Sequence, residues 1–188
     1  MAIRTKKLGV LLLLIILIIA AIFGIKYSAD KLYKTAYPKK YSQSIEKYAK
    51  EFNIDEDILY AIIKTESDFN PDVTSNVGAR GLTQIMNDTF DWIKTKLDDS
   101  DTVYDDMYES EDNIRYGAFL ISYLYHEFDS YETAVAAYHA GRTATGKWLK
   151  NKEYSSNGVT LDTIPVNDTR HYVNKVMKSF NMYKKLYK

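Results

Sequence analysis

The chain contains 188 residues, with 25 Lys and Arg residues against 25 Asp and Glu residues, and it has no cysteine. This length predicts one globular domain. The lack of cysteine excludes disulfides, thiol catalysis and metal sites built on thiolates. A net charge of zero argues against nucleic-acid binding, which usually requires a basic excess. An apolar fraction of 46% argues against disorder.

The first element along the chain is an uncharged stretch, residues 8–25, made almost entirely of Leu, Ile, Val, Ala and Gly. As a helix it would be about 27 Å long, close to the bilayer core of about 30 Å. The preceding residues 1–7 are basic, so the positive-inside rule places them in the cytoplasm. We therefore expect residues 8–25 to be a transmembrane anchor, with the rest of the chain outside the cytoplasm. A cleaved signal peptide is the alternative, but no convincing small-x-small cleavage site lies between Ala20 and Asp30.

The remainder predicts a tether followed by a helical domain. Residues 26–40 are mixed and charged, as expected of a tether, and residues 41–188 carry helical periodicity almost throughout. Asp55 is expected to cap the second helix and Gly141 to end the fifth. Residues 154–165 suit either a small hairpin or an ordered loop. The fold class is therefore all-α, and helices are expected over residues 41–52, 55–67, 84–97, 114–128, 134–140 and 169–187.

Glu66 is the residue whose position most strongly suggests chemistry. It follows Ile58 and Ile62 at spacings of four, so it continues the apolar face of its helix. Burial and the negative end of the helix dipole both favour the neutral acid. Raising a Glu pKa from about 4.3 to about 6 costs roughly 2.3 kcal/mol, which partial burial can supply. A carboxylic acid that is protonated near neutral pH is what a glycosidase needs. In the alternative interpretation, Glu66 turns to solvent and merely ends its helix.

The sequence gives no sign of a metal or cofactor site. The three histidines, His126, His139 and His171, lack metal-ligand spacing, and no phosphate- or dinucleotide-binding motif is present. We therefore expect the protein to use no metal and no other cofactor.

Four blocks in the chain resemble, in the same order, the motifs of the soluble lytic transglycosylase family, the SLT domain of the lysozyme-like superfamily. They read AIIKTESDFNP at residues 61–71, GLTQIM at 81–86, AYHAG at 137–141 and TRHYV at 169–173. The resemblance spans residues 41–187. It implies a single lysozyme-like helical domain that acts on the glycan strands of peptidoglycan.

The resemblance also implies roles for individual residues. Glu66 would be the single catalytic acid and base, and Tyr172 would hydrogen-bond near it. The substrate-binding residues implied are Ser75, Gln84, Met86, Tyr138, His139 and Tyr172. Two positions depart from the family pattern. Thr83 replaces Met, which we expect only to trim an apolar contact, and His139 replaces Asn, which adds a titratable group to the cleft.

The implied reaction is cleavage between N-acetylmuramic acid and N-acetylglucosamine without water. Glu66 would protonate the bridging oxygen and then accept the proton of the C6 hydroxyl, which closes a 1,6-anhydro ring. Two alternatives stay open. One is a goose-type muramidase, in which Asp68, Asp72 or Asp88 would position a water molecule. The other is a non-catalytic wall-binding scaffold module. The expected location is the cell membrane, as a single-pass protein with an extracytoplasmic catalytic domain.

Overall fold

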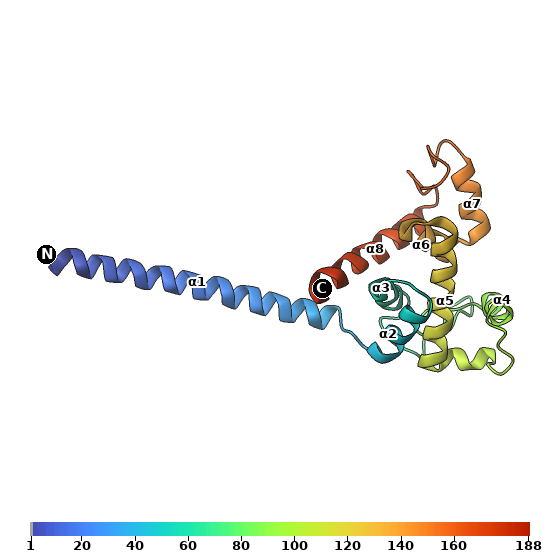
Figure 1. The fold of residues 1–188 in the computed structure, drawn as a ribbon, viewed down its shortest axis with the longest axis horizontal. Coiled ribbons are helices and arrows are strands. Elements are labelled where there is room, and N and C mark those ends of the chain that lie inside the picture. The colour runs from blue at the N-terminus through green and yellow to red at the C-terminus, as the bar shows by residue number, and fades with distance from the viewer. Residues whose placement is uncertain (1) are drawn as a thin grey trace. The chain divides into compact units, whose positions relative to one another are not determined.

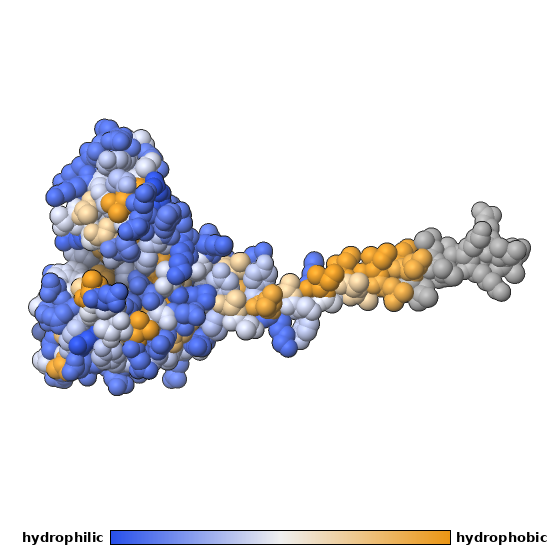
Figure 2. Space-filling view, turned by 180° about the vertical axis from the view of Figure 1, so that it is seen from behind, coloured by the Kyte–Doolittle hydropathy of each residue, from blue (hydrophilic) through white to orange (hydrophobic). Residues whose placement is uncertain are grey.

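The computed structural model describes the backbone of residues 2–188 and the side chains of residues 14–188. The chain forms two compact units, Met1–Pro38 and Lys39–Lys188. Helix α1 (Ala2–Ala36) makes up the first unit, and the described part of its surface exposes large apolar side chains such as Ile16, Ile18 and Phe23 (Figure 2).

The expected anchor, residues 8–25, lies partly outside the residues whose side chains are described. Over the described residues, none of the helices combines the length and the apolar character that crossing a membrane requires. The expected tether, residues 26–40, is helical as far as Ala36.

The second unit is all-α, as the sequence predicts, and it contains no β-strand among its residues 39–188. Within these residues, the β-type pairing is limited to isolated antiparallel bridges, which join Thr74 to Arg80 and Arg80 to Ile85. The elements are α2 (Ser42–Glu51), α3 (Glu56–Glu66), α4 (Asn87–Leu97), the 3-10 helix η1 (Tyr104–Tyr108), α5 (Ser110–Phe128), α6 (Tyr131–Ala140), α7 (Arg142–Lys150) and α8 (Asn167–Tyr187).

Two apolar clusters hold these helices together. Helix α8 packs against α3 and α6, and α5 packs against α2, α4 and α6 (Figure 1). The larger cluster joins α3, α5, α6 and α8 and includes Ile62, Ile121 and Val176, all fully buried. Each such side chain contributes about 1.5–3 kcal/mol when fully buried. A smaller cluster, including Phe90 and Met107, lies beneath α4. The packing of α8 on α3 fixes the last turn of α3, where Glu66 lies.

Several local expectations are confirmed. The Asp55 carboxylate accepts a hydrogen bond from Asp57 N at 3.1 Å and so caps α3. Helix α3 ends at Glu66, and its C-cap is Ser67. Gly141 adopts a φ of 87° directly after α6, which ends that helix as expected of a glycine. Residues 154–165 form an ordered loop and no hairpin, since the backbone there enters no strand.

Two helix expectations need correction. The third predicted helix begins at Asn87 instead of Gln84, because Gln84 adopts a left-handed φ of 51° that interrupts a helix. Helix α7 was not predicted at all. Its sequence is mostly small and polar, and only Thr145 and Leu149 are buried, so it lacks the apolar stripe that signals a helix.

Candidate active site

Glu66 is the last residue of α3, and its carboxylate faces α8. The Tyr172 hydroxyl donates a hydrogen bond to Glu66 Oε1 at 2.6 Å. Burial raises the pKa of Glu66 to about 7, although the Tyr172 hydrogen bond and the nearby charge of Lys175 both act to lower it. Near neutral pH, Glu66 therefore populates both its acid and its carboxylate forms, so one group can donate a proton and accept one.

Two partly buried tyrosines accompany Glu66. Burial raises the pKa of Tyr172 and of Tyr138 well above the ordinary value, and the negative charge of Glu66 acts in the same direction. Both phenols therefore keep their protons and act as hydrogen-bond donors. Tyr138, on α6, donates to the Thr83 carbonyl oxygen at 2.7 Å, which fixes its ring against the loop that precedes α4.

His139 lies beside Tyr172. The two ring centroids are 4.5 Å apart, and His139 Nδ1 is 3.1 Å from the hydroxyl of the buried Thr169. Burial lowers the pKa of His139, while the charge of Asp168 acts to raise it. His139 thus places a titratable ring next to the tyrosine that contacts Glu66.

Three other expected site residues, Ser75, Gln84 and Met86, lie in the loop that leads into α4. The Gln84 amide donates to the carbonyl oxygens of Val73 and Gly81, both at 2.9 Å. The Ser75 hydroxyl accepts a hydrogen bond from Ala79 N at 3.0 Å. Met86 is 40% exposed at the start of α4. Ser75 and Gln84 hold the loop in shape, and among the described residues no hydrogen bond links either of them to Glu66.

A buried asparagine that sequence reasoning missed holds this loop in place. Asn113 Oδ1 accepts hydrogen bonds from the backbone nitrogen and the hydroxyl of Thr83, both at 2.7 Å. Its Nδ2 donates to the carbonyl oxygens of Arg80 at 3.0 Å and Met107 at 2.8 Å. The sequence signal that could have found it is an amide side chain on the apolar side of a predicted helix, where a buried polar group needs hydrogen-bond partners.

The packing around Thr83 corrects a further expectation. Thr83 does more than trim an apolar contact, because its hydroxyl bonds Asn113. Gly117 faces it so closely that an added Cβ would lie 2.5 Å from Thr83 Cγ2. The absence of a side chain at residue 117 therefore lets the loop approach α5.

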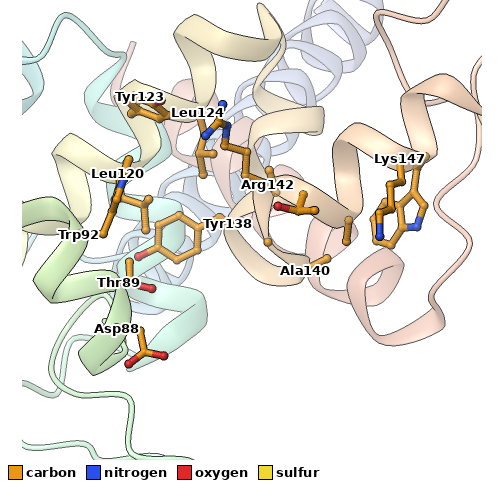
Figure 3. Close-up of a pocket in the computed structure, with 15 residues that line it drawn as sticks. Asp88, Thr89, Trp92, Leu120, Tyr123, Leu124, Tyr138, Ala140, Arg142 and Lys147 are labelled. Atoms are coloured by element: carbon orange, nitrogen blue, oxygen red, sulfur yellow. The ribbon is translucent and has the colours of Figure 1, made fainter. Parts of the chain in front are cut away.

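A pocket of about 690 Å³ lies beside Tyr138. Figure 3 shows Trp92 and Tyr138 on one side of it and Lys147 on the other. Glu66 does not line this pocket. Of the expected site residues, Tyr138 lines it. The residues that line it are Asp88, Thr89, Trp92, Leu120, Tyr123, Leu124, Ala137, Tyr138, Ala140, Gly141, Arg142, Thr143, Ala144, Lys147 and Trp148.

The three carboxylates that were expected as possible partners of Glu66 are either paired with a lysine or exposed to solvent. Asp68 pairs with Lys64 at 2.9 Å, and both Asp72 and Asp88 are exposed. Among the described residues, no group of three His, Asp or Glu side chains could hold a metal ion.

Comparisons with known proteins identify the family of the chain. The family model described as the transglycosylase SLT domain matches residues 43–158. The chain is 33% identical over 144 residues to the soluble lytic murein transglycosylase of Salmonella typhimurium, covering 75% of this chain and 22% of that protein. It is 27% identical over 183 residues to the membrane-bound lytic murein transglycosylase C of Haemophilus ducreyi, covering 85% of this chain and 49% of the relative.

Solved structures share the fold. The 70-kDa soluble lytic transglycosylase of Escherichia coli matches with a TM-score of 0.73 and 27% identity, covering 81% of this chain and 25% of that one. An inactive Glu-to-Gln mutant of the lytic transglycosylase Slt from Pseudomonas aeruginosa matches with a TM-score of 0.70 and 29% identity, covering 80% and 25%. The chain thus spans about a quarter of the length of these proteins. It belongs to the transglycosylase SLT domain family and has that family's lysozyme-like all-α fold.

Proposed function

We propose that residues 39–188 cleave the glycan strands of peptidoglycan by lytic transglycosylation, with Glu66 as the only acid and base. The observation that carries this proposal is the buried Glu66 carboxyl group, whose pKa is about 7 and which Tyr172 holds at 2.6 Å. The names of the relatives, which are murein transglycosylases, support the substrate class. The inactive Pseudomonas mutant, a glutamate changed to glutamine, supports the need for a carboxyl group in this family.

The reaction needs two proton transfers at one carboxyl group. Glu66 gives its proton to the oxygen between N-acetylmuramic acid and N-acetylglucosamine, and the bond from that oxygen to the muramic C1 breaks. The resulting Glu66 carboxylate accepts the proton of the C6 hydroxyl on the same muramic residue. The C6 oxygen then bonds to C1, which closes the 1,6-anhydro ring and returns Glu66 to its acid form. No water is consumed.

An intramolecular nucleophile explains why one carboxyl group is enough. Two-carboxylate glycosidases use the second carboxylate either to activate a water molecule or to attack the sugar as a nucleophile. Here the C6 hydroxyl is already attached to the reacting sugar, which supplies the orientation that a second carboxylate would otherwise impose.

The test compares the wild-type protein with Glu66→Gln on purified peptidoglycan, with mass spectrometry of the products. Wild type is expected to release 1,6-anhydromuramic ends, and Glu66→Gln to lose on the order of 10³-fold in rate. The matched control is Glu132→Gln, an exposed carboxylate on α6 that should keep full activity. Reducing ends would instead identify a muramidase. Equal binding without any cleavage would identify a wall-binding scaffold.

The same proposal includes the location of the protein. We propose that residues 8–25 anchor it in the cell membrane, with residues 1–7 in the cytoplasm and the catalytic unit outside, where it meets peptidoglycan. The exposed apolar side chains of α1 and the name of the membrane-bound relative support this. The full chain should stay with membranes after an alkaline wash, and Ile18→Lys should release a measurable fraction. A mature protein that begins beyond Ile25 would show a signal peptide instead.

A further inference from the structure

Helix α8 carries a charged surface that the proposed reaction does not use. Residues 169–188 include several lysines but no Asp or Glu. One side of the helix is buried, with Val176 and Phe180 in the core. At about 100° per residue, three exposed lysines lie on the opposite side, within about 80° of one another. The residues of this lysine stripe are Lys175, Lys178 and Lys185.

The charge of the lysine stripe is not compensated by the protein. Elsewhere on the C-terminal turns, Lys184 and Lys188 pair with the Asp55 carboxylate at 3.2 and 2.9 Å. Among the described residues, no stripe lysine forms an ion pair with a carboxylate. Lys175 instead donates to a neutral partner, the Thr65 carbonyl oxygen, at 3.3 Å. The stripe is therefore about 15 Å of available positive charge along one helix.

The C-terminal end of the stripe lies near the point where the chain enters the catalytic unit. That unit begins at Lys39. Lys39 Nζ lies 5.2 Å from the centre of the Tyr187 ring, and Lys185 is exposed in the same turn of α8. Residues 26–38 join Lys39 to the proposed anchor, and even fully extended they span about 45 Å. A membrane that holds the anchor therefore stays within reach of the catalytic unit, which raises its effective concentration at the stripe.

We propose that the lysine stripe docks the catalytic unit on an anionic membrane surface, with the phosphate groups of anionic phospholipids as its ligands. The proposal rests on the location proposed above, in which residues 8–25 lie in that membrane. Charge complementarity selects the ligand, because exposed lysine ammonium groups bind phosphate as point charges and need no cavity. Each lysine near an anionic surface favours binding about fivefold, so three favour docking about 100-fold.

Docking would also keep the reaction site near the membrane. Lys175 contacts Thr65, the residue before Glu66, so the stripe begins beside the catalytic acid. A docked unit would therefore hold Glu66 close to the lipid surface, and the peptidoglycan next to the membrane would be its substrate.

The experiment uses the full chain in lipid vesicles, with a fluorophore on Asn181→Cys, an exposed position beside the stripe. The chain has no cysteine of its own, so the label is unique. Energy transfer to a headgroup-labelled lipid is compared between vesicles of phosphatidylcholine and vesicles that also contain phosphatidylglycerol. Transfer should rise in the anionic vesicles, and it should fall again when the salt concentration is raised.

Replacing all three stripe lysines by glutamine should lower the ratio of docked to undocked protein about 100-fold, to that in neutral vesicles. The matched control removes the same charge by replacing three exposed lysines outside α8 with glutamine. It should keep the transfer of the parent protein. The control residues are Lys96, Lys150 and Lys152.

Equal transfer in the two kinds of vesicle would overturn the inference. Transfer that persists without the stripe lysines would also overturn it, as would an equal loss in the control. Binding of soluble polyphosphate by the stripe, with no response to lipid charge, would overturn it in favour of a phosphate polymer as the ligand. The anchor proposed above fails separately, since a protein without it would not float with the neutral vesicles.

Discussion

Asn113 of α5 and Glu66 of α3 are two polar side chains withdrawn from solvent, and they differ in how many hydrogen bonds they make. Asn113 is fully buried, and four hydrogen bonds join its amide to Thr83, Arg80 and Met107. The Glu66 carboxylate accepts one hydrogen bond from the described residues, that of Tyr172, and burial raises its pKa to about 7. A fully bonded group fixes geometry, whereas an incompletely bonded acid keeps the ability to exchange a proton.

The two side chains are connected through two residues, Thr83 and Tyr138. Thr83 gives its backbone N–H and its hydroxyl to Asn113, and its carbonyl oxygen accepts the hydrogen bond of Tyr138. The charge of Glu66 in turn contributes to the raised pKa of Tyr138. The fully bonded asparagine therefore supports the surroundings of Glu66. If this contrast is correct, changing Asn113 should mainly affect stability, and changing Glu66 or its neighbours should mainly affect protonation and rate.

The largest effect is expected for Asn113→Ala. The change leaves Thr83 N and the carbonyl oxygen of Met107 without their partner, whereas the carbonyl oxygen of Arg80 keeps its hydrogen bond from Ile85 N. Each unsatisfied buried group costs about 1–3 kcal/mol, so the free energy of unfolding should fall by about 3–5 kcal/mol. Urea denaturation measures it, with the exposed Asn174→Ala on α8 as the control. A loss below 1 kcal/mol would show that Asn113 is not the support of this loop.

A smaller effect is expected for Glu66→Gln, which should make the protein's stability less dependent on pH. The pKa of Glu66 is about 7 in the folded protein against an ordinary value of 4.5. The folded state thus holds a proton that the unfolded state releases, and the stability from that proton is present below pH 4.5 and lost as the pH rises through 7. Wild type should therefore lose about 2 kcal/mol of stability relative to Glu66→Gln between pH 5 and pH 8. Denaturant titrations at both pH values measure this, and parallel behaviour of the two proteins would contradict the burial of the acid.

Tyr172→Phe should lower the rate by about tenfold, since a single hydrogen bond to a charged group is worth about 1.5 kcal/mol. Its hydroxyl lowers the pKa of Glu66, so its removal should move the alkaline limb of the pH–rate profile to higher pH. The fold should persist, because the aromatic ring remains between α3 and α8. The matched control is Tyr187→Phe, near the far end of α8. An unchanged pH profile would mean that Tyr172 does not act on the carboxyl group.

The sequence predicts those features of the fold that depend on local periodicity. The apolar spacing over α3, α5 and α8 is strong, and these helices agree with the expected ranges to within a few residues. Periodicity also placed Glu66 on an apolar face, and the structure partly buries it. Helix α7 and η1 were missed because neither presents an apolar stripe, and tertiary contacts decide their conformation.

The arrangement of the site depends on contacts that no local pattern encodes. Glu66 and Tyr172 are 106 residues apart in the chain and meet only because α8 packs on α3. Their proximity could be expected only from the resemblance to a family. The bonding of Gln84 to its own loop follows from a left-handed backbone conformation that its residue type does not favour. The roles of Ser75, Gln84 and Met86 toward the substrate stay predictions.

The smallest effect is expected for His139→Asn, which restores the amide that the family pattern has at this position. Burial lowers the pKa of His139 from 6.5, so the ring is mostly neutral at pH 7.5 and becomes charged only in acid. Its ring lies 4.5 Å from that of Tyr172, so a charge there would favour the Glu66 carboxylate and oppose the developing positive charge on the sugar.

The ratio of the His139→Asn rate to the wild-type rate should therefore be close to one at pH 7.5 and about twofold higher at pH 5.5, because acidification increases the share of imidazolium. Rates of anhydromuropeptide release across this range measure the ratio. His171→Asn is the matched control, because His171 is exposed on α8 and, among the described residues, makes no ring contact with Tyr172 like that of His139. A ratio that stays constant between the two pH values would show that His139 contributes only its shape. A ratio that falls in acid would show that the imidazolium assists the reaction, as a second proton donor beside Glu66.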